Sequence, residues 1–152
     1  MKKAYFKAAS GSPLPLRLEV QRRIRFEEVD ALGIVWHGHY PSYFEDARVA
    51  LGDRFGVGYL DFHREGVITP IKQIRVDYIL PLRFGESCTI TAILNWTEAA
   101  RINFEFEIHN QAGELTTTGC TVQLFVDKDG NVLMYPPDFY MQFRERWLRG
   151  EL

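Results

Sequence analysis

A single helical stretch lies between stretches that alternate like strands, and this change of period leaves few possible folds. Apolar residues recur three or four positions apart over residues 40–55, which is the spacing of one helix face. Pro41 fits the first helical turn, where a missing N–H costs nothing, and Gly56 follows as a stop. The pattern therefore predicts one amphipathic helix from Tyr40 to Phe55.

Apolar and polar residues alternate on both sides of this helix, as in half-buried strands. The alternation covers residues 16–26, 74–80, 88–96, 102–108 and 120–126. We expect a loop over residues 56–66 and a turn at 127–131, and Asp138 can cap a short terminal helix that runs to Trp147. Because consecutive strands joined by short turns pair antiparallel, the predicted class is α+β with a mostly antiparallel sheet.

The chain has 152 residues, of which 46% are hydrophobic, and this is enough for one core without disulfides or a structural metal. We expect residues 1–15 to form a flexible N-terminal arm and residues 16–152 to form a single domain. The sheet can bury one face on the helix. Its other face and its edges then favour a homodimer.

Charge and cysteine content exclude several classes of protein. The formal net charge is −2 with both signs mixed along the chain, which gives no footprint for nucleic acid. A helix that spans a membrane needs about 18 apolar residues in succession, and no stretch of the sequence is that long. Cys88 and Cys120 lie far apart in alternating stretches, as expected for buried thiols in a reducing compartment. We therefore expect a cytoplasmic protein.

Asp30 and Gly33 stand just ahead of the predicted helix start, where free backbone N–H groups can polarise a carbonyl. Asp30 has two interpretations of about equal weight: a carboxylate that caps N–H groups, or a nucleophile or general base. Gly33 would let the backbone approach a ligand closely. His37 and His39 lack a third ligand nearby, so we expect hydrogen bonding rather than a metal site.

Other candidate groups in the sequence are less specific. Glu45 and Arg48 are three residues apart, which fits either an intrahelical ion pair or a carboxylate that faces a pocket. The chain contains no Gly-x-Ser-x-Gly nucleophile elbow. Cys88 and Cys120 lie in mid-strand without an activating turn, so we interpret both as core residues.

Several motifs occur together at the spacing found in one enzyme family. They are Asp30-x-x-Gly33-Ile-Val35-x-His37-x-x-Tyr40 with Phe44, Glu45, Ala47 and Arg48 behind it, Thr69-Pro70-Ile71, and Val76-Asp-Tyr78-x-x-Pro81-x-x-x-Gly85-Glu86. Together they resemble hotdog-fold acyl-CoA thioesterases of the 4-hydroxybenzoyl-CoA thioesterase family, including its branch associated with the Tol-Pal system. The resemblance covers roughly Leu18 to Leu133.

This resemblance implies a long central helix wrapped by a five-stranded antiparallel sheet, in dimers and often tetramers with active sites at the subunit interface. It implies hydrolysis of an acyl-CoA to the free acid and CoA, with Asp30 as nucleophile or general base and the helix start near His37 as oxyanion site. The substrate-binding positions would be Gly33, Tyr40, Glu45 and Thr69, with Glu45 and Thr69 coming from opposite subunits. No metal or other cofactor is expected.

One departure from the family pattern leaves the carrier of the acyl group open. Trp96-Thr-Glu-Ala-Ala100 stands where some members have consecutive basic residues for the CoA phosphates. CoA would then bind other cations, among them Arg101, Arg75 and Lys72, or the substrate would be an acyl carrier protein thioester. The alternative of a different class is a non-catalytic acyl-binding hotdog protein, and a hotdog dehydratase is a distant third.

Overall fold

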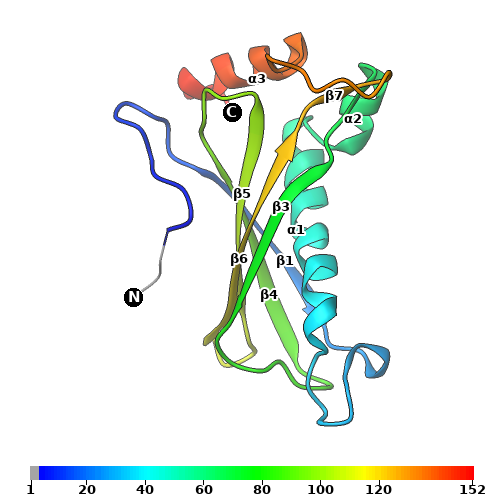
Figure 1. Cartoon of the computed structure of the whole chain (residues 1–152). Coiled ribbons are helices and arrows are strands. Elements are labelled where there is room, and N and C mark those ends of the chain that lie inside the picture. The colour runs from blue at the N-terminus through cyan, green and yellow to red at the C-terminus, as the bar shows by residue number, and fades with distance from the viewer. Residues whose placement is uncertain (1–3) are drawn as a thin grey trace.

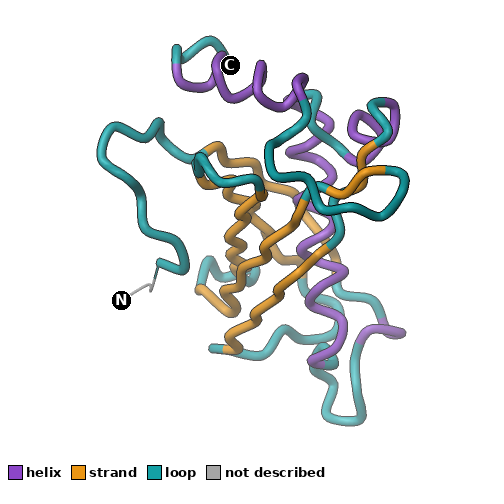
Figure 2. The backbone as a smooth tube through the Cα atoms, turned by 45° about the horizontal axis from the view of Figure 1, so that its top comes forward, coloured by secondary structure: helices purple, strands orange, loops and turns teal. Residues whose placement is uncertain are grey.

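The computed structural model describes residues 4–152, in which a five-stranded antiparallel sheet carries one long helix on one of its faces (Figures 1 and 2). The helix is α1, Tyr40–Phe55. The strands, in their order across the sheet, are β1 (Leu16–Arg23), β4 (Ser87–Asn95), β5 (Arg101–His109), β6 (Leu115–Leu124) and β3 (Ile71–Tyr78). The predicted α+β class and the antiparallel sheet are confirmed.

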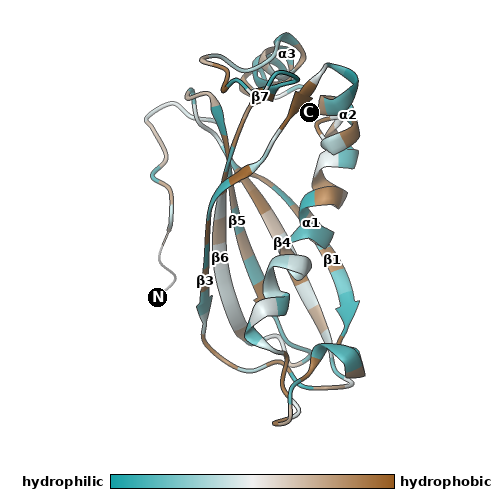
Figure 3. Cartoon of the chain, turned by 45° about the vertical axis from the view of Figure 1, so that its right-hand side comes forward, coloured by the Kyte–Doolittle hydropathy of each residue, from teal (hydrophilic) through white to brown (hydrophobic). Residues whose placement is uncertain are grey.

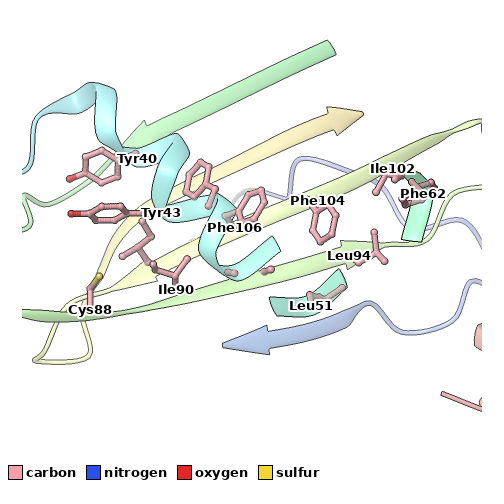
Figure 4. Close-up of a cluster of buried hydrophobic side chains, with 14 of the residues drawn as sticks. Tyr40, Tyr43, Leu51, Phe62, Cys88, Ile90, Leu94, Ile102, Phe104 and Phe106 are labelled. Atoms are coloured by element: carbon pink, nitrogen blue, oxygen red, sulfur yellow. The ribbon is translucent and has the colours of Figure 1, made fainter. Parts of the chain in front are cut away.

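Helix α1 begins and ends where the sequence predicts. Pro41 lies in its first turn, and Gly56 ends it with a φ of 69°, in the left-handed region that glycine adopts at low cost. The inner face of α1 packs on the sheet, where Phe44 stacks on Phe106 of β5 with ring centroids 4.5 Å apart (Figure 4). These contacts form the centre of the core.

Shorter helices and strands connect or follow these main elements. They are η1 (Phe26–Glu28), η2 (His37–His39), α2 (Tyr59–Arg64), β2 (Val67–Ile68), β7 (Val126–Asp127) and α3 (Asp138–Leu148). β2 and β7 pair with each other in a separate two-stranded sheet.

Three predictions at element ends were wrong. The first strand ends at Arg23 because the chain turns into η1, which leaves Phe26 78% exposed. The predicted loop over 56–66 contains helix α2, in which Asp61 caps the first turn by accepting a hydrogen bond from the N–H of Gly58 at 2.8 Å. Asp138 does not cap α3, because Pro137 occupies the N-cap and Asp138 is the first helical residue.

Strand β5 is buried on both faces, although its hydropathy alternates from residue to residue (Figure 3). Its inward side chains meet α1, and the outward Glu105 is only 6% exposed. The cover is the N-terminal segment, which runs along the side of the sheet opposite α1 (Figure 1). The backbone N–H groups of Tyr5 and Phe6 both donate to Glu105 at 3.1 Å. The first three residues of the predicted arm lie outside the described range.

The sheet has two edge strands, β1 and β3, and β3 is the last strand in the order. Along residues 4–152 no strand pairs with that edge. Apolar side chains nevertheless stand in solvent there: Ile74 is 45% exposed and Tyr78 51%. An unpaired edge with exposed apolar groups is a site for pairing with another chain.

Candidate active site

Asp30 lies at the start of a tight turn that precedes α1. The turn is closed by hydrogen bonds from the N–H of Asp30 to the carbonyl of Ile34 at 2.9 Å and from the N–H of Gly33 to the carbonyl of Asp30 at 3.0 Å. Gly33 has a φ of 74°, which explains why glycine is required at this position. The Oδ1 atom of Asp30 accepts a hydrogen bond from the N–H of Leu32 at 2.8 Å. The carboxylate therefore caps its own turn and not the helix.

The base of this turn is anchored by a buried carboxylate. Glu28 is 3% exposed and accepts hydrogen bonds from Arg22 Nη2 at 2.7 Å and from the N–H of Arg25 at 2.9 Å. Arg22 also pairs with Asp46 on α1 at 2.6 Å. Burial alone would raise the pKa of Glu28, but the Tyr43 hydroxyl, the Arg25 N–H and the Arg22 guanidinium face the carboxylate and lower its pKa overall. These contacts fix the position of the turn relative to β1 and α1.

The start of the helix offers unpaired backbone donors. The η2 turn runs directly into α1, so the N–H groups of His37 and Gly38 open the helical stretch and have no carbonyl one turn earlier to bind. The hydroxyl of Tyr78 donates to the carbonyl of His37 at 2.6 Å and ties the turn to β3. A Cβ at Gly38 would lie 2.1 Å from the Trp36 ring, so any larger residue here would require that half-exposed ring to move. The His37 imidazole itself is exposed.

Glu45 and Thr69 belong to a second group of residues, further along α1 and in the link just ahead of β3. The Tyr59 hydroxyl donates to Glu45 at 3.2 Å, and Arg48 Nε lies 3.2 Å from the same carboxylate. The amide of Gln123 donates to the carbonyl of Thr69 at 2.7 Å. Arg48, Tyr59, Thr69 and Gln123 line one cavity, and Glu45 stands beside it. The ion pair of Glu45 with Arg48 is thus present, whereas Glu45 is not among the residues that line the cavity, and a carboxylate that faces a pocket stays a prediction.

The predicted site residues thus fall into separate places. Asp30, Gly33 and His37 share the exposed turn and the helix start, whereas Glu45 and Thr69 are at the cavity. Tyr40 belongs to neither group, because it is 2% exposed in the core (Figure 4). It packs edge to face on Tyr78 with ring centroids 5.0 Å apart. The cavity is lined by residues of the second group and not by Asp30 or His37.

Sequence reasoning missed several of these residues. The sequence leaves Tyr59 open between an aromatic lining of an acyl pocket and a filler of the core, and Gln123 is an ordinary polar position in an alternating strand. No signal in the sequence places either beside Arg48. Aromatic residues stand close to a glycine around Trp36 and Gly38. This sequence signal could have indicated the close packing of the Trp36 ring on the helix start.

Among residues 4–152, no group of three or more side chains could hold a metal ion. Within the same range, no helix has the length and apolar character to cross a membrane.

Comparison with known proteins identifies the family. A model described as the Thioesterase-like superfamily matches residues 24–143, which is most of the folded chain. The chain belongs to the Thioesterase-like superfamily. Its α+β arrangement is the hotdog fold, as the sequence resemblance implied. Membership of the Tol-Pal branch stays a prediction.

Relatives of this superfamily member include proteins named as thioesterases. YneP of Bacillus subtilis, whose name provisionally assigns it as an acyl-CoA thioesterase, is 31% identical over 106 residues, 70% of this chain and 77% of that protein. A chloroplastic acyl-acyl carrier protein thioesterase of Arabidopsis thaliana is 28% identical over 80% of this chain and 65% of its own length. The solved structure of DHNA-CoA thioesterase from Staphylococcus aureus has a TM-score of 0.76 and 26% identity, and the match covers 90% of this chain and 96% of that one.

Proposed function

We propose that this protein is an acyl-CoA thioesterase that hydrolyses its substrate to a free acid and CoA. The observation that supports this most directly is the arrangement at the start of α1. A carboxylate, Asp30, stands on a rigid turn just ahead of the open N–H groups of His37 and Gly38. Relatives in the same superfamily are named as thioesterases.

The proposed chemistry follows from the charge that develops during the reaction. The carbonyl oxygen of a thioester becomes negative when the carbon is attacked, and N–H groups already aimed at it stabilise that charge by about 3 kcal/mol per donor. The N–H groups at His37 and Gly38 would bind this oxygen. Asp30 would either attack the carbonyl carbon, breaking the C–S bond and releasing the CoA thiolate to leave a mixed anhydride that water then hydrolyses, or deprotonate a water that attacks the carbon and displaces the same thiolate.

We propose that the working unit is a homodimer formed along the free β3 edge. Its exposed Ile74 and Tyr78 would be buried there, and Tyr78 contacts the helix start through His37. The turn of one chain would then face the Glu45 and Thr69 group of the other chain, which would complete the site with an acyl pocket. The assembly of such dimers into tetramers remains a prediction.

The carrier of the acyl group is proposed to be CoA. The cations that could bind the CoA phosphates are not equally available. Arg75 already donates to both carboxylate oxygens of Asp77, at 3.0 and 3.1 Å, whereas Lys72 is exposed. Arg101 is exposed at the start of β5. An acyl carrier protein thioester is the second candidate, because a relative in Arabidopsis thaliana is named for that substrate.

The test measures release of free thiol from acyl-CoA esters and acyl carrier protein thioesters with short, long and aromatic acyl groups. Asp30→Asn should abolish the activity of the wild-type protein and leave the fold intact. Asp129→Asn is the matched control, because Asp129 also lies in an exposed turn and the change should leave the rate unaltered. Equal silence of wild type and Asp30→Asn on every ester, together with tight ligand binding, would establish a non-catalytic acyl-binding protein instead.

A further inference from the structure

Pro41 deprives one carbonyl at the helix start of its usual helical partner. In an α-helix the carbonyl of a residue accepts from the N–H four positions later, and four positions after His37 stands Pro41, which has no N–H. Tyr78 of β3 supplies a donor in its place, because its hydroxyl donates to the His37 carbonyl at 2.6 Å. The opening of the helical stretch is therefore held from the sheet.

The peptide group that Tyr78 binds also carries one of the proposed oxyanion donors. A peptide unit joins the carbonyl of one residue to the N–H of the next, so the His37 carbonyl and the Gly38 N–H are two ends of one planar group. That N–H is among those left open at the start of the helical stretch. A hydrogen bond at the carbonyl end fixes the direction of the N–H, and it polarises the group so that the N–H becomes a stronger donor.

The Tyr78 side chain is itself held in place. Its ring packs edge to face on the ring of Tyr40, with centroids 5.0 Å apart, and Tyr40 is buried in the core. β3 pairs with β6 as far as Tyr78, opposite Thr117, so the sheet and not a loop carries the donor. Partial burial raises the pKa of the Tyr78 phenol, which therefore keeps its proton at neutral pH.

We propose that Tyr78 is a positioning residue of the oxyanion site, which aims the Gly38 N–H at the transition-state oxygen by holding the His37 carbonyl. The inference rests on the proposed function and adds to it a residue that acts through another. A misaimed donor loses most where charge develops, so removal of the hydroxyl should affect kcat and not KM. Because Tyr78 is 51% exposed on the β3 edge, the proposed pairing of subunits there would also shield this hydrogen bond from water.

The experiment measures kcat and KM of Tyr78→Phe on the acyl ester that the wild-type protein hydrolyses fastest. This variant keeps the ring on Tyr40 and removes only the hydroxyl. kcat should fall about 10-fold with KM unchanged, less than the about 10²–10³-fold cost of losing an oxyanion donor outright, because the Gly38 N–H remains. Tyr135→Phe is the matched control: Tyr135 is 79% exposed in the loop ahead of α3, and loss of its hydroxyl should leave both constants unchanged.

A second protein keeps the shape of the side chain and changes only the acidity of the donor. Difluorotyrosine at position 78 has a phenol of lower pKa than tyrosine, and a phenolate cannot donate a hydrogen bond. kcat should therefore fall at a lower pH than in the wild-type protein. Tyr40, the titratable group against the ring, and His37, whose carbonyl accepts the hydrogen bond, are the same in both proteins.

Each outcome decides the proposal. An equal kcat for the wild-type protein and Tyr78→Phe, or a change confined to KM, would overturn it and leave the thioesterase function standing. Silence of the wild-type protein on every ester, acyl carrier protein thioesters included, would overturn the proposed function and this inference with it. If Tyr78→Phe does not fold or assemble as the wild-type protein does, the difluorotyrosine protein decides, and a pH profile identical to that of the wild-type protein would overturn the inference.

Discussion

At the scale of single residues, Gly119 shows how closely the helix approaches the sheet. A Cβ built on Gly119 would lie 2.5 Å from the Phe44 ring and 2.7 Å from the carbonyl of Arg75. The ring lies on α1 and the carbonyl on β3, so neither can move without disturbing the core or the sheet. The absence of a side chain here allows Phe44 to stack on Phe106.

Gly119→Ala should therefore lower the free energy of unfolding by about 1–3 kcal/mol, the usual cost of overpacking a core. Urea denaturation measures the change. Gly113→Ala is the control. A Cβ at position 113 would meet no atom within 4 Å, so the only cost there is the strain of a side chain at a φ of 82°. A smaller loss for Gly119→Ala than for Gly113→Ala would show that the helix can shift away from β6.

Cys88 is expected to be chemically inert in the folded protein. Burial raises the pKa of its thiol to about 12, so the reactive thiolate is scarce at neutral pH. A thiol reagent at pH 8 should modify Cys88 only after a denaturant is added, and a Cys120→Ser background isolates its signal. Because the pKa is raised on folding, Cys88 contributes stability below about pH 9 that is lost as pH rises towards 12. Rapid labelling without denaturant would contradict this.

Candidate residues were predictable where a motif specifies them and not where neighbours do. Asp30, Gly33 and His37 are adjacent in the sequence, so their shared location could be predicted from spacing. The grouping of Tyr59, Thr69 and Gln123 around Arg48 depends on contacts between elements far apart in the chain. No local pattern reports such contacts.

At the scale of elements, a buried arginine ties α3 to the connection between β4 and β5. Arg144 donates to the carbonyls of Ala99 at 2.6 Å and of Glu98 at 3.3 Å. Burial, the largest effect, lowers the pKa of Arg144. The Trp147 indole N–H donates to the carbonyl of Leu14, so the same helix also holds the N-terminal segment.

Arg144→Met should destabilise the fold by about 1–3 kcal/mol, because these carbonyls lose a charged donor. Arg146→Met, on the exposed side of α3, is the matched control and should stay within about 0.5 kcal/mol of wild type. Thermal unfolding and hydrogen exchange in the β4–β5 hairpin measure both. Equal stability of the two variants would show that apolar packing alone holds α3.

The ends of α1 could be predicted from sequence because Pro41 and Gly56 act through backbone geometry, which is local. Burial of the outer face of β5 could not be predicted from sequence. Alternation of apolar and polar residues is typical of a strand with one wet face, and only the contacts of Tyr5 and Phe6 with Glu105 show that this face is covered. Helix α2 was missed because its six residues carry too short a pattern.

At the scale of the whole molecule, the exposed β3 edge is the feature a single chain leaves incomplete. Ile74→Asp places a charge on the proposed pairing edge and should convert a dimer into monomers, measured by light scattering on a sizing column. Met134→Asp is the control, since Met134 is 82% exposed in a loop away from this edge. A dimer that survives Ile74→Asp would place the interface elsewhere.

The turn that carries Asp30 has a consequence for how the rate depends on enzyme concentration. The Asp30 carboxylate accepts a hydrogen bond from the N–H of Leu32 in the same turn. The residues proposed to bind the acyl group lie in another part of the chain. A solitary chain would thus present a carboxylate to bulk water with no pocket to orient a substrate. In a dilution series, the initial rate should change from first to second order in protein concentration as the subunits separate. The concentration at which activity is lost then measures the dissociation constant of the dimer.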